Sequence, residues 1–163
     1  MVEGLKLELL SPNLVLLIDE ILTNQNICKY LYYDDKNPLG RSTIADTSGL
    51  LLTKIYPYPF SSAIIDECTQ LRIYYPDGEF DSTGVIEQSL VLFDIICHKN
   101  LWLINDGTNS LIRPYEIMKE LANLFKPSLG TVGKLKFKRF NHLFVNDKFD
   151  CIRLMAEMMT IGG

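Results

Sequence analysis

The sequence is poor in the residue types and motifs from which catalytic and metal sites are most often built. It has two histidines and one tryptophan in 163 residues. It contains no G-x-x-x-x-G-K-[ST], G-x-G-x-x-G or G-x-S-x-G, the patterns that hold phosphates or present a nucleophilic serine. We therefore expect no catalytic residue, no metal site and no cofactor in this chain.

Cysteine pairs are also missing, because no C-x-x-C occurs and the four cysteines are widely separated: Cys28, Cys68, Cys97 and Cys151. This spacing suits neither a zinc ribbon nor a small disulfide framework. Each cysteine lies in or beside an apolar segment, where a reduced thiol behaves as a small hydrophobic group. The pattern predicts a protein that is made in a reducing cytoplasm.

Positive charge and long apolar runs are lacking as well. The formal net charge is -4, which gives no general reason to expect the chain to wrap nucleic acid. The first residues, MVEGLKLELLSPN, have no basic start and are interrupted by Glu8, so they do not resemble a signal peptide. We expect a soluble protein with no membrane contact.

What is present is an ordinary globular composition, with 47% apolar and 22% charged residues. A chain of this length fits one domain, residues 1–163, with a core that needs no disulfide or metal. Ser11 and Pro12 favour the start of a helix that we expect to run to about Tyr33, with TNQN loosening its middle. Its apolar stripe follows helical spacing through Leu14, Leu17, Ile18, Ile21 and Leu22.

Residues 34–68 show no clean periodicity, and we expect them to form an extended arm or loop. The segment YPYPF (56–60) contains two prolines, which disfavour a regular helix. Its aromatic side chains, Tyr56, Tyr58 and Phe60, argue against disorder because large apolar groups favour burial. They could pack on the sheet of their own chain or on a neighbouring subunit.

The remaining sequence alternates between strand and helix patterns. Strands are expected at 69–75 and 86–98, forming an antiparallel hairpin around a loop at 76–85. Residues 101–105 either continue the second strand past a kink or form another short strand. A helix is expected at 113–125, and two strands follow, in GKLKFKRF and in CIRLMAEMM. The fold class is therefore α+β, an antiparallel sheet with a long hairpin packed against two helices, plus the extended arm.

The stretch SLVLFDIICHKNLW places Asp94, Cys97 and His98 within five residues. In a strand, Asp94 and His98 share a face but lie about 13 Å apart, and Cys97 points to the opposite face. A hydrogen-bonded dyad requires about 3 Å, so the three residues cannot form a self-contained site. The acidic loop DGEFD lacks the spacing of a calcium loop, and we interpret it as solvated.

The segment KLKFKRF is the one local basic feature, with Lys134, Lys136 and Lys138 alternating with apolar residues. Lysines along a strand edge prevent pairing with other strands, and they can also form a subunit contact. Alternatively, they could face a polyanion such as DNA passing through a pore, or an acidic neighbouring subunit.

Taken in order, these segments resemble the tail-completion proteins of tailed bacteriophages, the tail terminators and head–tail joining proteins of the neck. The resemblance rests on LTNQNICKYLYYDDKNPL, KIYPYPF, LVLFDIICHKNLW, LIRPYEIMKEL and the closing GKLKFKRF … NDKFDCIRLMAEM. It spans nearly all of residues 12–160. The long arm at 34–68 departs from the most compact members, which leaves open a terminator, a connector adaptor or stopper, or another neck protein.

The resemblance implies a structural role in the virion neck after synthesis in the host bacterial cytoplasm. Such proteins assemble as rings, often hexameric, between the tail tube protein and the head connector or stopper, with DNA only passing through the lumen. The family has no catalytic residues to transfer. We therefore expect Tyr56, Tyr58 and Phe60 to form inter-subunit contacts, and Lys134, Lys136 and Lys138 to contact the lumen or a partner.

Two other classes of function stay open at this point. One is a monomeric binding module, unrelated to phages, that recruits a partner strand through the hairpin at 69–105. The other is a small hydrolase that uses His98 or His142.

Overall fold

The computed structural model describes residues 7–60, 66–126 and 134–159, and within them the α+β class is confirmed. The helices in these ranges are α1 (Leu10–Leu22), α2 (Gln25–Tyr32) and α3 (Arg113–Leu124). The strands are β1 (Ile55–Tyr56), β2 (Thr69–Tyr74), β3 (Gly78–Phe80), β4 (Ile86–His98), β5 (Leu103–Asn105), β6 (Ser110–Ile112), β7 (Lys134–Phe144) and β8 (Phe149–Met159).

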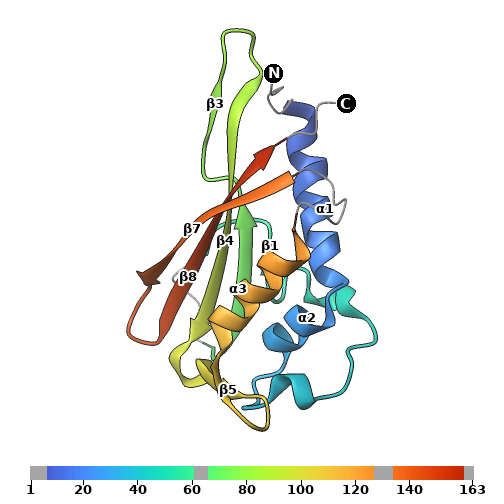
Figure 1. Ribbon diagram of the computed structural model, residues 1–163, viewed down its shortest axis with the longest axis vertical. Helices are drawn as coiled ribbons and strands as arrows, with labels where there is room; N and C mark the ends of the chain where they lie inside the picture. The colour runs from blue at the N-terminus through green and yellow to red at the C-terminus, as the bar shows by residue number, and fades with distance from the viewer. Residues whose placement is uncertain (1–6, 61–65, 127–133, 160–163) are drawn as a thin grey trace.

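The main sheet has the strand order β1-β2-β4-β8-β7, and β3 pairs with the beginning of β4. All of its pairs are antiparallel except β1 with β2. The hairpin of β3 and β4 projects beyond the other strands, and the helices pack against one face of the sheet (Figure 1). The long β2–β4 hairpin and the closing β7–β8 hairpin are both as predicted from the sequence.

The helix expected to run from Pro12 to Tyr33 is in fact two helices, and the predicted start was wrong. A 3-10 turn precedes α1, which begins at Leu10, so Ser11 lies inside the helix and is not its N-cap. The break falls at the polar TNQN. There, the side chain of Asn24 accepts a 2.9 Å hydrogen bond from the backbone N–H of Ile27 and caps α2.

One connection differs from the prediction, and a second matches one of its two alternatives. The expected loop at 76–85 contains β3, which is short and fully exposed and therefore lacks an apolar alternation that would identify it. Within residues 101–105, β5 is the further short strand that was one of the two predicted alternatives, and it pairs with β6 in a separate two-stranded sheet. Gly107 in the intervening turn has a φ of 93°, a conformation that favours glycine.

The core lies between the helices and one face of the sheet. Alternate residues of β2, β4 and β8 point into it, and they meet the apolar stripes of all three helices. Its largest sheet member is Phe93, which is fully buried and lies 6.0 Å from Phe125 and 6.2 Å from Phe137, measured between ring centroids. The four cysteines are unpaired and buried, as their apolar surroundings predict.

The described part of the 34–68 arm lies against the body of the protein. It contains two 3-10 turns and β1, and it supplies Leu50 and Ile55 to the core. Residues 61–65 lie outside the described ranges. The arm is therefore irregular but partly built into the sheet through β1, which runs parallel to β2.

None of the helices in the described ranges is long and apolar enough to span a bilayer.

Candidate functional site

The aromatic residues of the arm surround a buried arginine on the sheet face opposite the helices. Arg72 in β2 is 3% exposed, and its guanidinium carbon lies 3.6 Å from the centroid of the Tyr56 ring, 5.3 Å from that of Tyr58 and 5.7 Å from that of Phe60. Its Nε and Nη2 donate to the side-chain oxygen of Gln70 at 3.1 and 2.7 Å. Burial lowers the pKa of Arg72. Because Nη1 of Arg72 also donates to the carbonyl of Pro59 at 3.5 Å, the cluster fixes the arm to the sheet by cation–π and hydrogen-bond contacts.

This placement answers the question that the sequence left open for two of the three aromatics. Tyr56 and Phe60 are only partly exposed, and both contact their own chain, Phe60 through Arg72 and Phe149. Tyr58 also approaches Arg72, but it remains 48% exposed and is available for a further contact. The inter-subunit role of the three residues stays a prediction.

Next to this cluster, Asp94, Arg153 and Tyr74 form a second polar network on the same face. Arg153 donates to both carboxylate oxygens of Asp94, at 2.8 and 3.0 Å, and the Tyr74 hydroxyl donates to Asp94 Oδ2 at 2.6 Å. The hydrogen bond to Asp94 raises the pKa of Arg153, and burial, with the same carboxylate, raises the pKa of Tyr74 to about 12. The side chain of Asp94 therefore accepts three hydrogen bonds within the network, two from Arg153 and one from Tyr74.

A shallow groove of about 260 Å³ opens beside this network. One wall is polar, formed by Tyr74, Asp94 and Arg153, and the opposite wall is apolar, formed by the β7–β8 turn and Phe60. Phe144 on that turn is 75% exposed. The groove could accept an apolar side chain from a partner, and its polar groups already satisfy one another.

Asp94, Cys97 and His98 of β4 have separate surroundings and do not form one site. Asp94 is held by Arg153, and Cys97 is fully buried, where burial raises the pKa of its thiol to about 11. His98 is 6% exposed and its Nδ1 accepts a 3.1 Å hydrogen bond from the backbone N–H of Asn100. That contact begins the 3-10 turn after β4.

The second histidine lies on the exposed edge of the sheet. His142 Nε2 lies 2.8 Å from Asp150 Oδ2, and the ring stacks on Trp102 with a centroid distance of 5.5 Å. Within the described ranges, no group of three or more His, Cys, Asp or Glu side chains is placed to hold a metal ion.

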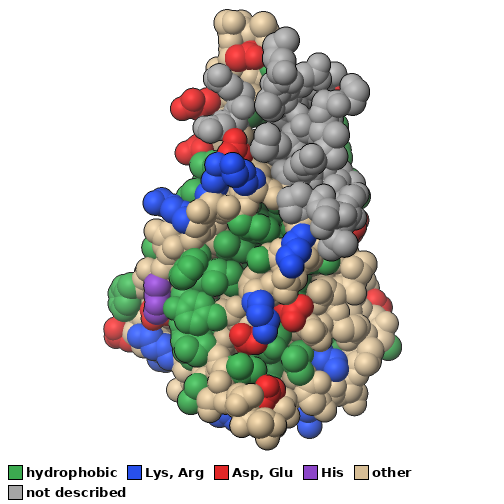
Figure 2. Space-filling view, viewed as in Figure 1, with side chains coloured by type: hydrophobic (Ala, Val, Ile, Leu, Met, Phe, Trp, Pro, Cys, Tyr) green, Lys and Arg blue, Asp and Glu red, His purple; other side chains and the backbone are tan. Residues whose placement is uncertain are grey.

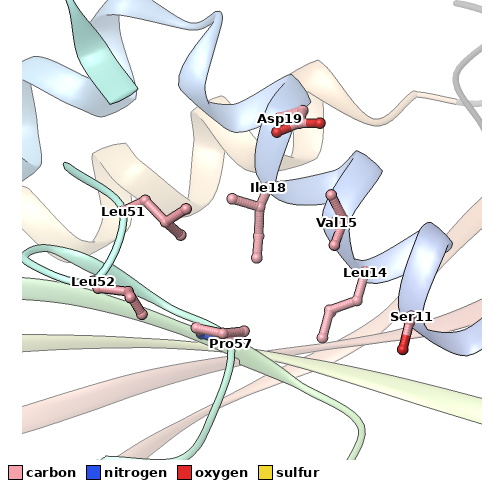
Figure 3. Close-up of a pocket in the computed structure, with 8 residues that line it drawn as sticks. All are labelled: Ser11, Leu14, Val15, Ile18, Asp19, Leu51, Leu52 and Pro57. Atoms are coloured by element: carbon pink, nitrogen blue, oxygen red, sulfur yellow. The ribbon is translucent and has the colours of Figure 1, made fainter. Parts of the chain in front are cut away.

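An apolar groove of about 350 Å³ lies between α1 and the loop before β1. Leu14, Val15 and Ile18 of α1 face Leu51, Leu52 and Pro57 across it (Figure 3). Leu52 is 55% exposed and has a φ of 64°, which is unusual for a residue other than glycine. Both features leave an apolar surface open at this position.

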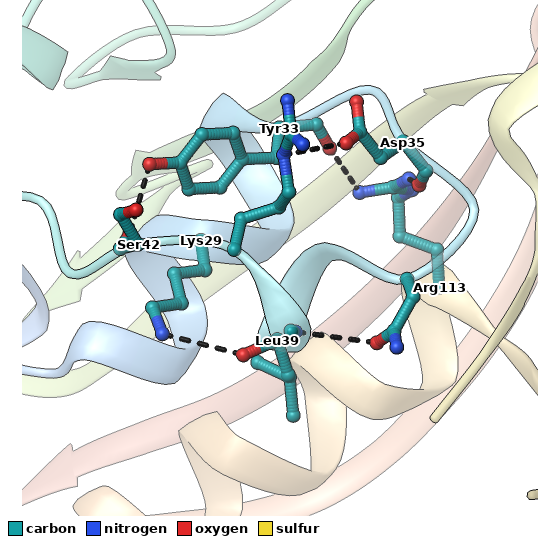
Figure 4. Close-up of polar contacts among 9 residues, drawn as sticks. Lys29, Tyr33, Asp35, Leu39, Ser42 and Arg113 are labelled. Carbon is teal, nitrogen blue, oxygen red and sulfur yellow. Dashed lines mark hydrogen bonds and ion pairs between the residues drawn. The ribbon is translucent and has the colours of Figure 1, made fainter. Parts of the chain in front are cut away.

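A second buried arginine, Arg113, joins α2, the following loop and α3. Arg113 is fully buried and donates to four backbone carbonyls, those of Leu101 at 2.8 Å, Tyr30 at 2.6 Å, Tyr33 at 2.8 Å and Asp35 at 2.9 Å. Figure 4 shows it inserted beneath this loop. Two of the carbonyls belong to the C-terminal end of α2, where the helix dipole favours a cation. Arg113 therefore has a structural role.

The predicted basic strand is β7, an edge strand of the sheet. Lys136 is exposed, and Lys138 lies at a bulge and pairs with Glu157 of β8 at 3.1 Å. The side chain of Lys134 lies outside the described part of the structure. Phe140, on the helix side of the same strand, is 54% exposed and contacts Tyr115 of α3. Apolar side chains gather over the middle of this face (Figure 2).

The sequence did not single out Arg72, Arg113 or Arg153. A signal was available, because Arg72 and Arg153 each interrupt a run of strand-forming apolar residues, in TQLRIYY and in CIRLMAE. An arginine at such a position needs a partner in the fold. Arg113, before the helix-starting Pro114, gave no comparable signal.

The comparisons with known proteins return one family. The YomW profile matches residues 24–158, from the start of α2 to the end of β8. No curated protein and no solved structure matches the chain. The match covers most of the chain and includes every strand of the main sheet, so the chain belongs to the YomW family, a phage-associated family.

Proposed function

We propose that this chain is a structural protein of the phage neck, a ring-forming tail terminator or tail-completion protein that joins the tail tube to the head connector. The observation that carries the proposal is a sheet whose strands β3 and β7, on opposite edges, each pair on one side only among the described strands, in a chain of a phage-associated family. Among the described strands, β7 pairs only with β8, and its eleven residues carry the exposed Phe140 and Phe144. A long strand edge with exposed aromatics favours association with another protein surface.

Assembly into a ring requires a contact that differs on its two sides, because identical patches facing each other produce only dimers. The two edges of this sheet differ in length, charge and shape, which is what a head-to-tail contact needs. Under this proposal the ring, often hexameric in such proteins, surrounds the channel through which DNA passes. Lys134, Lys136 and Lys138 contact the lumen or a partner.

The test of the role is removal of the gene from the phage that carries it. We expect cells to accumulate filled heads and separate tails, seen by electron microscopy, and complementation with the wild-type gene to restore joined particles. Normal infectious particles without the gene would overturn the proposal. Heads that have lost their DNA would instead favour a stopper or connector adaptor over a terminator.

The aromatic arm provides a second test, of the assembly contact alone. Replacing Tyr58 and Phe60 with alanine should weaken self-association, measured as the mass from light scattering. A replacement of Tyr32 by alanine is the matched control, because Tyr32 is 52% exposed but belongs to α2. An unchanged mass in the double variant would remove the arm from the interface without affecting the proposed role.

A further inference from the structure

We infer that the acidic β3 segment, residues 77–81 of the projecting β3–β4 hairpin, docks against the outer edge of β7 in a second copy of this chain. The inference rests on the proposed ring-forming function and names the contact between its subunits. It assigns the exposed Lys136 of β7 a protein partner, the carboxylates of the neighbouring copy, whereas Lys138 already pairs with Glu157 of its own chain.

The β3 segment is exposed, acidic and free of positive charge. Asp77, Glu79 and Asp81 are all exposed, and the sequence has no lysine or arginine between Arg72 and Lys99. Acidic side chains are visible at this projecting end of the molecule in Figure 2. Asp81 accepts hydrogen bonds from the backbone and hydroxyl of Thr83, which lower its pKa and shape the turn.

The edge of β7 has the opposite charge. Residues 134–139 include four cations, Lys134, Lys136, Lys138 and Arg139, and the next acidic residue in the sequence is Asp147. Lysines and a bulge normally protect an edge strand from pairing with unrelated strands. A strand that carries carboxylates can still pair with this edge, because its negative charges are attracted to the same lysines.

The topology places these two elements where one copy can extend the sheet of the next. β3 pairs with β4 on the side away from β8, so β3 and β7 lie on opposite edges of the sheet. They also lie at the same end, because Gly78, Ser89, Met158 and Leu135 form one row across the strands. β7 runs antiparallel to β3, so a neighbouring β3 in the same orientation forms an antiparallel pair with β7.

The charged side chains of β3 and β7 also point to the same face of the sheet. Leu135 is 2% exposed and faces the core, so Lys136 points to the face away from the helices. Gly78 shares the row of Leu135, so Glu79 points away from the helices as well. A sheet continued from one copy to the next therefore brings carboxylates beside lysines on one face. Phe80, 60% exposed, lies on the other.

Zero-length carbodiimide coupling tests the contact, since it joins a carboxylate to a lysine only when they touch. Within one chain Glu79 and Lys136 are separated by two intervening strands, about 14 Å at ~4.8 Å per strand step. We mix ¹⁵N-labelled and unlabelled protein, couple, digest and analyse the peptides by mass spectrometry. We expect amides between the 77–81 and 134–139 peptides of differently labelled chains, with a yield that falls as salt is raised.

Charge reversal provides the decisive experiment. Glu79→Lys alone and Lys136→Glu alone should each reduce the inter-chain yield at least several-fold, and the double variant with both changes should recover it. Asp19→Lys on α1 and Lys126→Glu after α3 are the matched controls, because both residues are exposed and lie away from the two strands. Circular dichroism checks that each variant is folded.

Each outcome decides a separate question. Chains that couple only through other peptides, or that stay uncoupled at the highest soluble concentration, overturn the contact. A double variant whose inter-chain yield does not recover also overturns the contact. If gene removal still leaves heads and tails unjoined, the neck function stands and only this interface is wrong. If the peptides couple as expected but particles form normally without the gene, the interface stands and the neck function is wrong.

Discussion

The two faces of the main sheet are built from the same strands but stabilised in different ways. The helix-side face is apolar, with Ile73, Phe93 and Leu154 packed under the helices. The opposite face carries Arg72 and Asp94, both almost fully buried, which are held by hydrogen bonds and aromatic rings. The hydrophobic effect does not depend on the orientation of the groups that are buried. A buried charge, in contrast, is stable only when it is paired and hydrogen-bonded. The second face therefore depends on the geometry of individual contacts.

The largest expected effect is on the helix-side face. Phe93→Ala removes a fully buried ring that packs against Phe125 and Phe137. Such a truncation leaves a cavity and should lower the free energy of unfolding by about 3–5 kcal/mol. Urea denaturation followed by circular dichroism measures it. Phe144→Ala on the exposed end of β7 is the control and should change stability by less than about 0.5 kcal/mol.

On the opposite face, Asp94→Ala should lower the free energy of unfolding by a smaller amount, about 2–3 kcal/mol. The loss is smaller because the side chain of Arg153 is partly exposed and can be hydrated again. The loss comes from the unpaired guanidinium and from the Tyr74 hydroxyl. Replacing the pair together, with Asp94→Leu and Arg153→Met, should bring the stability back to within ~1 kcal/mol of the wild type. A double-mutant cycle from urea denaturation measures the coupling, and additive losses would contradict the network.

A smaller effect is expected where the arm meets Arg72. Tyr56→Leu keeps the apolar bulk but removes the ring nearest the guanidinium, and it should cost ~1 kcal/mol. Tyr58→Leu should cost less, because its ring is farther from Arg72 and half exposed. Equal losses, measured by urea denaturation, would show that packing of the arm matters more than the cation–π contact.

The smallest expected effect concerns pH. The pKa of Tyr74 is raised to about 12 from its ordinary value of 10.0, so the folded state holds this proton more tightly than the unfolded state. Its contribution to stability is complete below pH 10 and decreases between pH 10 and 12. Tyr30 and Tyr75, on the helix side, are raised to about 12 as well. Tyr74→Phe should make the fall in urea midpoint over this range shallower, and an unchanged slope would contradict it.

Much of the fold could be predicted because the signals were local. The β-branched run at Ile86–His98 and the helix stripe after Arg113 define their elements by composition and spacing alone. The break before Asn24 was visible as a polar interruption, but whether it ends a helix depends on the cap formed in the fold. β3 was missed because a short, exposed strand is specified by its partner strand rather than by its own residues.

The candidate site was less accessible from the sequence. Tyr56, Tyr58 and Phe60 were singled out as groups that favour burial, which holds in part for Tyr56 and Phe60 but not for the exposed Tyr58. The arginine that they surround lies twelve or more residues further along the chain. The pairing of Asp94 with Arg153 depends on strand register across 59 positions. Contacts of this kind follow from topology, and periodicity carries no information about them.

The position of Arg113 has a consequence for the order of events during synthesis. The carbonyls of Tyr30, Tyr33 and Asp35 receive their donor from a residue made about 80 positions later. At ~5–20 residues per second, the ribosome needs several seconds to supply it. Until then these three carbonyls lack the donor that they have in the folded protein. The amino-terminal third of a nascent chain should therefore stay sensitive to protease until the arginine emerges, and become resistant in one step afterwards.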